Sequence, residues 1–180
     1  MGANLVDNSL VRRFKWVLVI IRTSGFIEGS TRLQKIVFLV NDRVKELSQE
    51  PFYRDWVPGN YGPFSKNLAN DLNEGLATRL IGKWPVKNSS GFLVDRFGLN
   101  PDNPESDEIV RKAVAEHPKI YSKIDELVKA YSKAPLMSLL HDVYYGFPQY
   151  ASGSTIRAEV AARTGTADTH LSNVYDEPDE

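Results

Sequence analysis

The sequence of 180 residues predicts a mostly helical α+β fold, and three features carry that prediction. Apolar residues recur at helical spacing over residues 30–48 and again over residues 63–74. A connector rich in aromatic residues joins the two segments. Two runs of strand-forming residues follow, separated by the sequence N-S-S-G at residues 88–91, which is typical of a hairpin turn. Two helices followed by a hairpin indicate a winged helix-turn-helix, which we expect to form the core of residues 1–98.

The helix expected over residues 30–48 begins at Ser30, whose hydroxyl can accept a hydrogen bond from a backbone N–H of the first turn. It must end before Pro51, because the residue that precedes a proline avoids helical backbone angles. One face of this helix is apolar, which predicts burial against the rest of the fold. This face carries Leu33, Ile36, Val37, Val40, Val44 and Leu47.

The second helix of the motif is expected over residues 63–74. Pro63 would stand at its first position, where a proline costs no hydrogen bond, and Gly75 would form a left-handed cap at its end. Aromatic residues dominate residues 52–58, so this connector is expected to be extended. The buried side of the helix would carry Phe64, Leu68 and Leu72.

Another helix is expected to precede the motif, over residues 8–23. Its V-L-V-I-I run at residues 17–21 is also compatible with a strand, but the length of the apolar pattern favours a helix. Residues 26–29 form a short connector that could add one rung to a sheet. The densest basic cluster of the sequence lies in this helix and fits either a solvated face or a patch that contacts phosphates. The cluster consists of Arg12, Arg13 and Lys15.

Residues 99–156 are expected to form a C-terminal helical lobe packed on the first domain. Ser106 would cap its first helix, and prolines at positions 118, 135 and 148 divide the remainder into short amphipathic helices. Few large apolar residues follow, so residues 157–180 are expected to be an acidic, exposed tail. The core expected from both domains includes Leu33, Ile36, Val37, Val40, Leu68, Leu72, Leu139 and Val143.

Composition excludes several classes of protein. The chain has no cysteine, which excludes disulfides and thiolate metal sites, and its 3 histidines are far apart in the sequence. The first residues lack the basic and apolar regions of a signal peptide, and the longest strongly apolar run is too short to cross a bilayer. We therefore expect a cytoplasmic protein that binds no membrane, no metal and no cofactor.

Charge is distributed unevenly, although the formal net charge is only −1. Residues 1–100 contain 14 Lys/Arg and 9 Asp/Glu residues, whereas residues 101–180 contain 8 and 14. This asymmetry fits a protein with a mildly basic working half and an acidic second half. It fits equally well two ordinary solvated surfaces.

Two motifs resemble those of a known family. The sequence T-R-L-Q-K-I-V-F-L-V at residues 31–40 and the sequence Y-G-P-F-S at residues 61–65 resemble the YwgA-like group of small prokaryotic winged-helix proteins. More distantly, they resemble the Panacea (SocA-like antitoxin) domain. The segment L-L-H-D-V-Y-Y-G-F-P-Q-Y at residues 139–150 is similar to a late helix in those proteins. The first resemblance implies the fold without an established activity, and the second implies a protein that neutralises a toxin or presents a partner to other machinery.

The sequence contains no recognisable catalytic pattern, since it lacks a nucleophile elbow, a phosphate-binding glycine loop and a zinc-protease motif. We therefore expect a non-enzymatic protein without catalytic residues. The leading hypothesis is a transcriptional regulator that binds double-stranded DNA. In a winged helix the second helix of the motif enters the major groove, and its N-terminus attracts phosphate. The residues expected to contact DNA are Arg32, Lys35, Ser65, Lys66, Asn67, Asn70, Lys83 and Lys87.

The alternative hypothesis is a protein-interaction adaptor or an antitoxin-like module that does not bind DNA directly. The sequence has more aromatic residues than one core must bury, and exposed aromatic clusters mark partner surfaces. The partner would be another protein or a second copy of this chain. The residues expected to contact it are Trp56, Tyr61, Phe64, Tyr144 and Tyr145.

Overall fold

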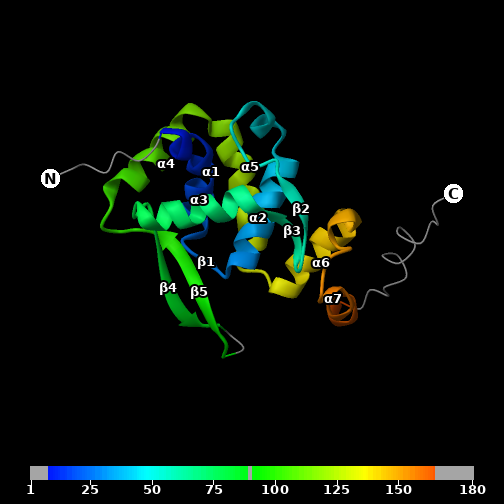
Figure 1. Cartoon of the computed structure of the whole chain (residues 1–180). Coiled ribbons are helices and arrows are strands. Elements are labelled where there is room, and N and C mark those ends of the chain that lie inside the picture. Colours follow the sequence, from blue (N-terminus) through cyan, green and yellow to red (C-terminus); the bar gives the residue numbers. More distant parts are fainter. Residues whose placement is uncertain (1–7, 89–90, 165–180) are drawn as a thin grey trace.

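The computed structural model describes residues 8–88 and 91–164 and shows a mostly helical α+β chain (Figure 1). Within the described residues the α-helices are α1 (Asn8–Ser24), α2 (Ser30–Arg43), α3 (Lys66–Ala77), α4 (Pro104–Glu116), α5 (Pro118–Tyr131), α6 (Leu136–Gly146) and α7 (Arg157–Thr164). The strands are β1 (Ile27–Glu28), β2 (Trp56–Gly59), β3 (Gly62–Ser65), β4 (Ile81–Lys87) and β5 (Leu93–Leu99). The short 3-10 helices are η1 (Lys45–Gln49) and η2 (Pro148–Tyr150).

The larger of the two antiparallel sheets has the strand order β1-β5-β4. Its hairpin, β4–β5, projects away from the helical body (Figure 1). Ile27 of β1 pairs with Phe97 of β5, and both side chains are buried, so the base of the hairpin belongs to the core. Strand β4 lies at an edge of the sheet and carries Pro85, which has no N–H to donate to a further strand.

Helix α1 is the centre of the core. Every side chain from residue 16 to residue 21 is fully buried, because α1 packs against α4 and α5 as well as β5 and α3. A helix that is apolar on all sides is stable only in such an enclosed position. The V-L-V-I-I run is therefore helical, as the length of its pattern predicts, and all eight core residues expected from the sequence are buried.

The start of α3 differs from the prediction. Residues 62–65 form a strand rather than the first turn of a helix, and α3 begins at Lys66 with Ser65 as its N-cap. The Gly-Pro step fits a hairpin here because Gly62 has a φ of 86° and Pro63 pairs with Pro58 of β2. Phe64, expected on the buried side of this helix, lies on β3 and is partly exposed.

The end of α3 also differs from the prediction, since the helix continues through Gly75 to Ala77. Gly75 is required for a close approach of two helices rather than for a cap. A Cβ atom at this position would lie 2.6 Å from the ring of Phe14 on α1. The residue with a left-handed backbone is Arg79, two positions beyond the helix, with a φ of 60°.

Three other helix ends differ from the prediction. Helix α2 stops at Arg43, and Gly29 rather than Ser30 occupies its N-cap. Asn103, not Ser106, caps α4, since its side chain accepts a hydrogen bond from the backbone N–H of Glu105 (3.1 Å).

The C-terminal helices share one core with the first domain. Helices α4 and α5 pack on α1, and α6 packs on α2, so residues 99–156 complete the core of the preceding residues. Residues 157–164, expected to belong to an exposed tail, instead form α7, which packs on α6 and buries Val160 and Ala161. Residues 165–180 lie outside the described part of the chain.

The substitution Gly75→Ala tests the close packing of α3 on α1. Alanine improves helix propensity by about 1 kcal/mol, but overpacking a core position typically costs about 1–3 kcal/mol. We expect the overpacking to win, because the nearest atoms belong to the buried ring of Phe14. The free energy of unfolding, measured with urea, should fall. Asn73→Ala, at an exposed position of the same helix, should change it by less than about 0.5 kcal/mol. Stabilisation by Gly75→Ala would contradict this packing.

Candidate interaction cleft

The two motifs singled out in the sequence bind each other through Gln34. The side-chain amide of Gln34 on α2 donates to the carbonyl oxygen of Ser65 (3.1 Å) and accepts from the backbone N–H of Ser65 (3.0 Å). This side chain therefore takes the place of a neighbouring strand along the second edge of β3. Both residues are buried, so the paired hydrogen bonds are protected from water.

Lys35 adds a second link between α2 and β3. Its ammonium group donates to the carbonyl oxygen of Pro63 (2.9 Å), and the residue is only 2% exposed. Burial of the cation lowers the pKa of Lys35 to about 8. Arg32, one turn earlier on α2, is also used internally, since its Nη1 atom donates to the carbonyl oxygen of Tyr131 at the end of α5 (3.0 Å) and to that of Ala134 just after it (2.6 Å).

The hairpin turn is fixed from its other side by α6. A Cβ atom at Gly62 would lie 2.6 Å from the ring of Tyr144, so only glycine allows this approach. Tyr144 is 1% exposed, and its hydroxyl lies 2.8 Å from the hydroxyl of Ser154. Gly62 is thus held between α2 and α6.

The N-terminus of α3 already holds an anion, the carboxylate of Asp55. The Ser65 hydroxyl accepts from the backbone N–H of Leu68 (3.0 Å) and donates to Asp55 (2.6 Å). Asp55 also accepts from the backbone N–H of Asn67 (2.9 Å). Burial opposes the charged form of Asp55, but these hydrogen bonds outweigh it and lower the pKa of the carboxyl group. The helix end is therefore occupied in the folded chain.

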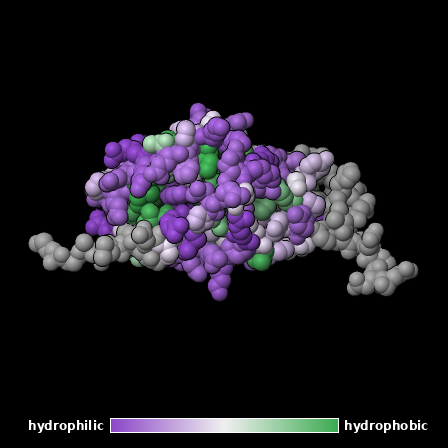
Figure 2. Space-filling model, turned by 90° about the horizontal axis from the view of Figure 1, so that it is seen from above, coloured by the Kyte–Doolittle hydropathy of each residue, from purple (hydrophilic) through white to green (hydrophobic). Residues whose placement is uncertain are grey.

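These elements enclose a cleft of about 620 Å³ between α2, the β2–β3 turn, α3 and the β4–β5 hairpin. We call it the α3 cleft. Its wing side carries Lys83 and Asp95, which form an ion pair (3.3 Å). The face of the molecule seen from above, away from the hairpin, is mostly hydrophilic with scattered apolar areas (Figure 2). The apolar residues that line the α3 cleft are Tyr61, Phe64, Ala69, Leu72, Leu76 and Phe97.

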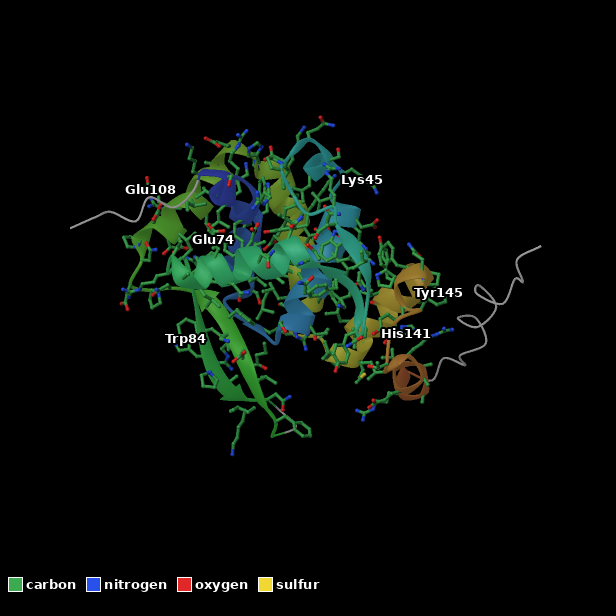
Figure 3. The ribbon with its side chains drawn as sticks, viewed as in Figure 1. Lys45, Glu74, Trp84, Glu108, His141 and Tyr145 are labelled. Atoms are coloured by element: carbon green, nitrogen blue, oxygen red, sulfur yellow. The ribbon has the colours of Figure 1, made fainter. Side chains whose placement is uncertain are left out.

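The apolar surface of the cleft continues along the hairpin. Lys83 pairs with Phe97 and Lys87 pairs with Leu93, and alternate residues of a strand share a face. Lys87 and Leu93 therefore extend the cleft side of the hairpin towards its tip, where Leu93 is 72% exposed. Trp84 lies on the opposite face, with its indole ring over Gly82 and Gly98 (Figure 3).

The structure changes the set of residues that could contact DNA. Lys35 and Ser65 are buried and hydrogen-bonded inside the protein, so neither can contact DNA as expected. The expected phosphate site at the start of α3 is likewise wrong, because Asp55 occupies it. The positions that remain on the surface are Lys66, Asn67, Asn70, Lys83 and Lys87, with Arg32 partly buried.

The basic cluster of α1 is largely used for internal ion pairs. Arg13 binds both carboxylate oxygens of Asp71 (2.9 and 3.0 Å), and Lys15 binds Glu50 (2.7 Å). The buried Asp71 also accepts from the hydroxyl of Tyr53 (2.9 Å), and burial raises the pKa of that tyrosine, so it remains a donor. Arg12 is exposed. These contacts support a mainly structural role for the cluster.

The residues expected at a protein interface are only partly brought together. Tyr61 and Phe64 line the α3 cleft and are 47% and 39% exposed. Tyr144 is buried, which corrects its assignment, and Trp56 packs edge-on against Phe38 with a centroid distance of 5.2 Å. Tyr145 is 64% exposed on α6 and stacks on His141, outside the cleft (Figure 3).

Sequence patterns missed two carboxylates that hold α3 in place, Asp55 at its N-terminus and Asp71 on its buried side. No pattern marks Asp55 as the partner of α3, because it lies ten residues before the cap that it binds. Asp71 was detectable in principle, since a carboxylate between Leu68 and Leu72 on an apolar helix face needs a buried partner.

Burial of Lys35 predicts a measurable pH dependence of stability. The unfolded chain keeps the proton of this lysine up to about pH 10.5, whereas the folded chain releases it near pH 8. The unfolded state therefore binds more protons between these values, and the free energy of unfolding should rise with pH across this window. The contribution is at most about 3 kcal/mol. Lys35→Met should lack this rise when both proteins are unfolded with urea from pH 7 to 10.5. Parallel curves for the two proteins would show that Lys35 titrates normally.

Among residues 8–88 and 91–164, no helix is long and apolar enough to cross a membrane. The same residues contain no group of three or more His, Cys, Asp or Glu side chains that could hold a metal ion.

Comparisons with protein-family models, with curated proteins and with solved structures found no match to this chain.

Proposed function

We propose that this chain is a non-enzymatic winged-helix protein that uses the α3 cleft to bind an amphipathic segment of another protein, in an adaptor or antitoxin-like role. The connectivity supports the winged-helix assignment. Helix α1, strand β1, helices α2 and α3 and the hairpin β4–β5 follow one another in the order of that fold, and β1 pairs with β5. The β2–β3 hairpin is an insertion between the two helices of the motif.

The observation that carries the proposal is the apolar α3 cleft with two exposed aromatic residues at its mouth. Tyr61 and Phe64 keep 47% and 39% of their surface in contact with solvent. Exposed aromatic residues around a concave apolar surface are typical of sites that bind partner proteins. The rigid attachment of β3 to α2 preorganises this surface, which lowers the entropic cost of binding.

Charge around the cleft indicates the chemistry of the partner. Lys83 and Lys87 lie on the cleft side of the hairpin, and Asp95, which also lines the cleft, is paired with Lys83. A partner segment with apolar side chains on one face and carboxylates beside them would match this surface. It would place its apolar face against Leu72 and Leu76 and its carboxylates towards the hairpin.

Crosslinking from defined positions tests this proposal. A photoreactive amino acid at Tyr61 should capture the partner in cells, whereas the same residue at Tyr145, which is exposed but outside the cleft, should not. With the captured partner purified, the double variant Tyr61→Ala, Phe64→Ala should weaken binding at least tenfold, or about 1.4 kcal/mol. Tyr145→Ala is the matched control and should leave the affinity unchanged. Equal effects of the cleft variants and the control would overturn the proposal.

Direct DNA binding by a transcriptional regulator is the second candidate function. The observation in its favour is that Lys66, Asn67 and Asn70 are exposed along α3, where a winged helix presents its base-reading side chains. Glu74, also exposed on α3, offsets the charge of Lys66 (Figure 3). Because phosphate neutralisation dominates affinity for DNA, the nearly neutral surface of α3 makes this candidate the weaker one.

A salt titration with random duplex DNA tests the second candidate. If α3 and the hairpin bind DNA, affinity should fall steeply with salt, and Lys87→Ala should reduce the salt slope by about one unit. Asn70→Ala should relax the preference at one base pair at a cost of about 1–3 kcal/mol. Lys129→Ala, on the distant helix α5, serves as the control. Absence of salt-dependent binding by the wild-type chain would eliminate this candidate.

A further inference from the structure

The sequence after α7 has the chemistry that the α3 cleft is expected to bind. Residues 165–180 contain five Asp and Glu residues and no Lys or Arg. Their larger apolar residues, Leu171, Val174 and Tyr175, are spaced at i, i+3 and i+4, which is the spacing of one helix face. This segment is thus amphipathic and acidic.

The chain passes the mouth of the cleft shortly before this segment. The backbone N–H of Thr155 donates to the carbonyl oxygen of Asn60 (3.0 Å), and the Thr155 hydroxyl donates to the same oxygen (3.2 Å). Gly153 lies against Pro58 and Gly59. Asn60 and Gly59 both line the α3 cleft. Residues 153–155 are therefore attached to the β2–β3 turn at the cleft.

The remaining chain is long enough to reach the cleft. Helix α7 has 8 residues and spans only about 12 Å, so its end remains near the β2–β3 turn. The 16 residues from 165 to 180 can span at most about 55 Å when fully extended, or about 24 Å as a helix. Because the segment is tethered this close, its effective concentration at the cleft is on the order of millimolar. Even a segment with low intrinsic affinity would then bind the cleft.

We propose that residues 165–180 bind the α3 cleft of the same molecule and so compete with the partner protein. Leu171, Val174 and Tyr175 pack against Tyr61, Phe64 and Leu76, and the acidic residues face Lys83 and Lys87. This inference rests on the proposed function for its biological meaning, because the tail then acts as an internal competitor. The physical contact between tail and cleft is testable without any partner.

Disulfide trapping provides the test, because the full chain contains no cysteine. The double variant Asn73→Cys, Val174→Cys places one thiol on a cleft-lining, exposed position of α3 and the other in the tail. Under mild oxidation of a dilute sample, we expect an intramolecular disulfide, seen by mass spectrometry and non-reducing electrophoresis. Thr31→Cys, also at the cleft, replaces Asn73→Cys if circular dichroism shows that the first variant does not fold.

The matched control is Glu108→Cys, Val174→Cys. Glu108 is exposed on α4, on the other side of the molecule from α7 (Figure 3). The cleft pair should form its disulfide at least ten times faster than this pair. Adding Tyr61→Ala and Phe64→Ala should slow the cleft pair towards the control rate. Equal rates for the two pairs, an unchanged rate in the cleft variants, or disulfides mainly between two molecules would overturn the proposal.

Failure of this inference and failure of the proposed function give different results. If trapping fails while the cleft variants still weaken partner binding, the tail is not the competitor but the cleft remains the partner site. If the disulfide forms as expected while the cleft variants leave the affinity for the partner unchanged, the tail binds the cleft and the proposed function is wrong.

Discussion

The attachment of β3 to α2 is the interaction on which the rest of the cleft depends. A two-stranded hairpin is barely stable in water, and β3 would expose its second edge. The Gln34 side chain forms hydrogen bonds with both the N–H and the carbonyl oxygen of Ser65 on that edge, and Lys35 donates to the carbonyl oxygen of Pro63. Because Ser65 is also the N-cap of α3, the same attachment determines where α3 begins and which of its side chains face the cleft. Loss of the Gln34 pair would therefore disturb the hairpin, the helix start and the cleft together.

The core packs against one side of α3, and the polar and charged residues of the cleft lie on its other side. Residues 16–21 of α1 are fully buried, and α3 approaches this helix closely at Gly75. Asp71, on the same side of α3, is compensated by Arg13 and Tyr53 rather than by water. The fold thus places apolar packing behind α3 and leaves the front of the helix for the cleft.

Much of the fold follows from local patterns in the sequence. Apolar periodicity predicted the helices and all eight core positions, and turn residues predicted the β4–β5 hairpin, because both signals depend on neighbours within a few residues. The candidate site depended on contacts that no local pattern encodes. The Gly62-Pro63 step resembles a helix start in sequence, but it pairs with β2 as a strand and is held by the distant residues Gln34 and Tyr144. Likewise Lys35 has the composition of a surface cation, and its burial follows from a carbonyl group 28 residues away.

Pro85 has a consequence for how the projecting hairpin behaves in a crowded solution. An outer strand with unpaired backbone groups is a template on which other chains can add strands and grow into aggregates. Strand β4 is such an outer strand, and its hairpin has a strongly apolar residue, Leu93, near the tip. The missing N–H of Pro85 interrupts the row of donors that an incoming strand would need. The hairpin can therefore expose apolar side chains to solvent while its backbone discourages the stacking that leads to fibres.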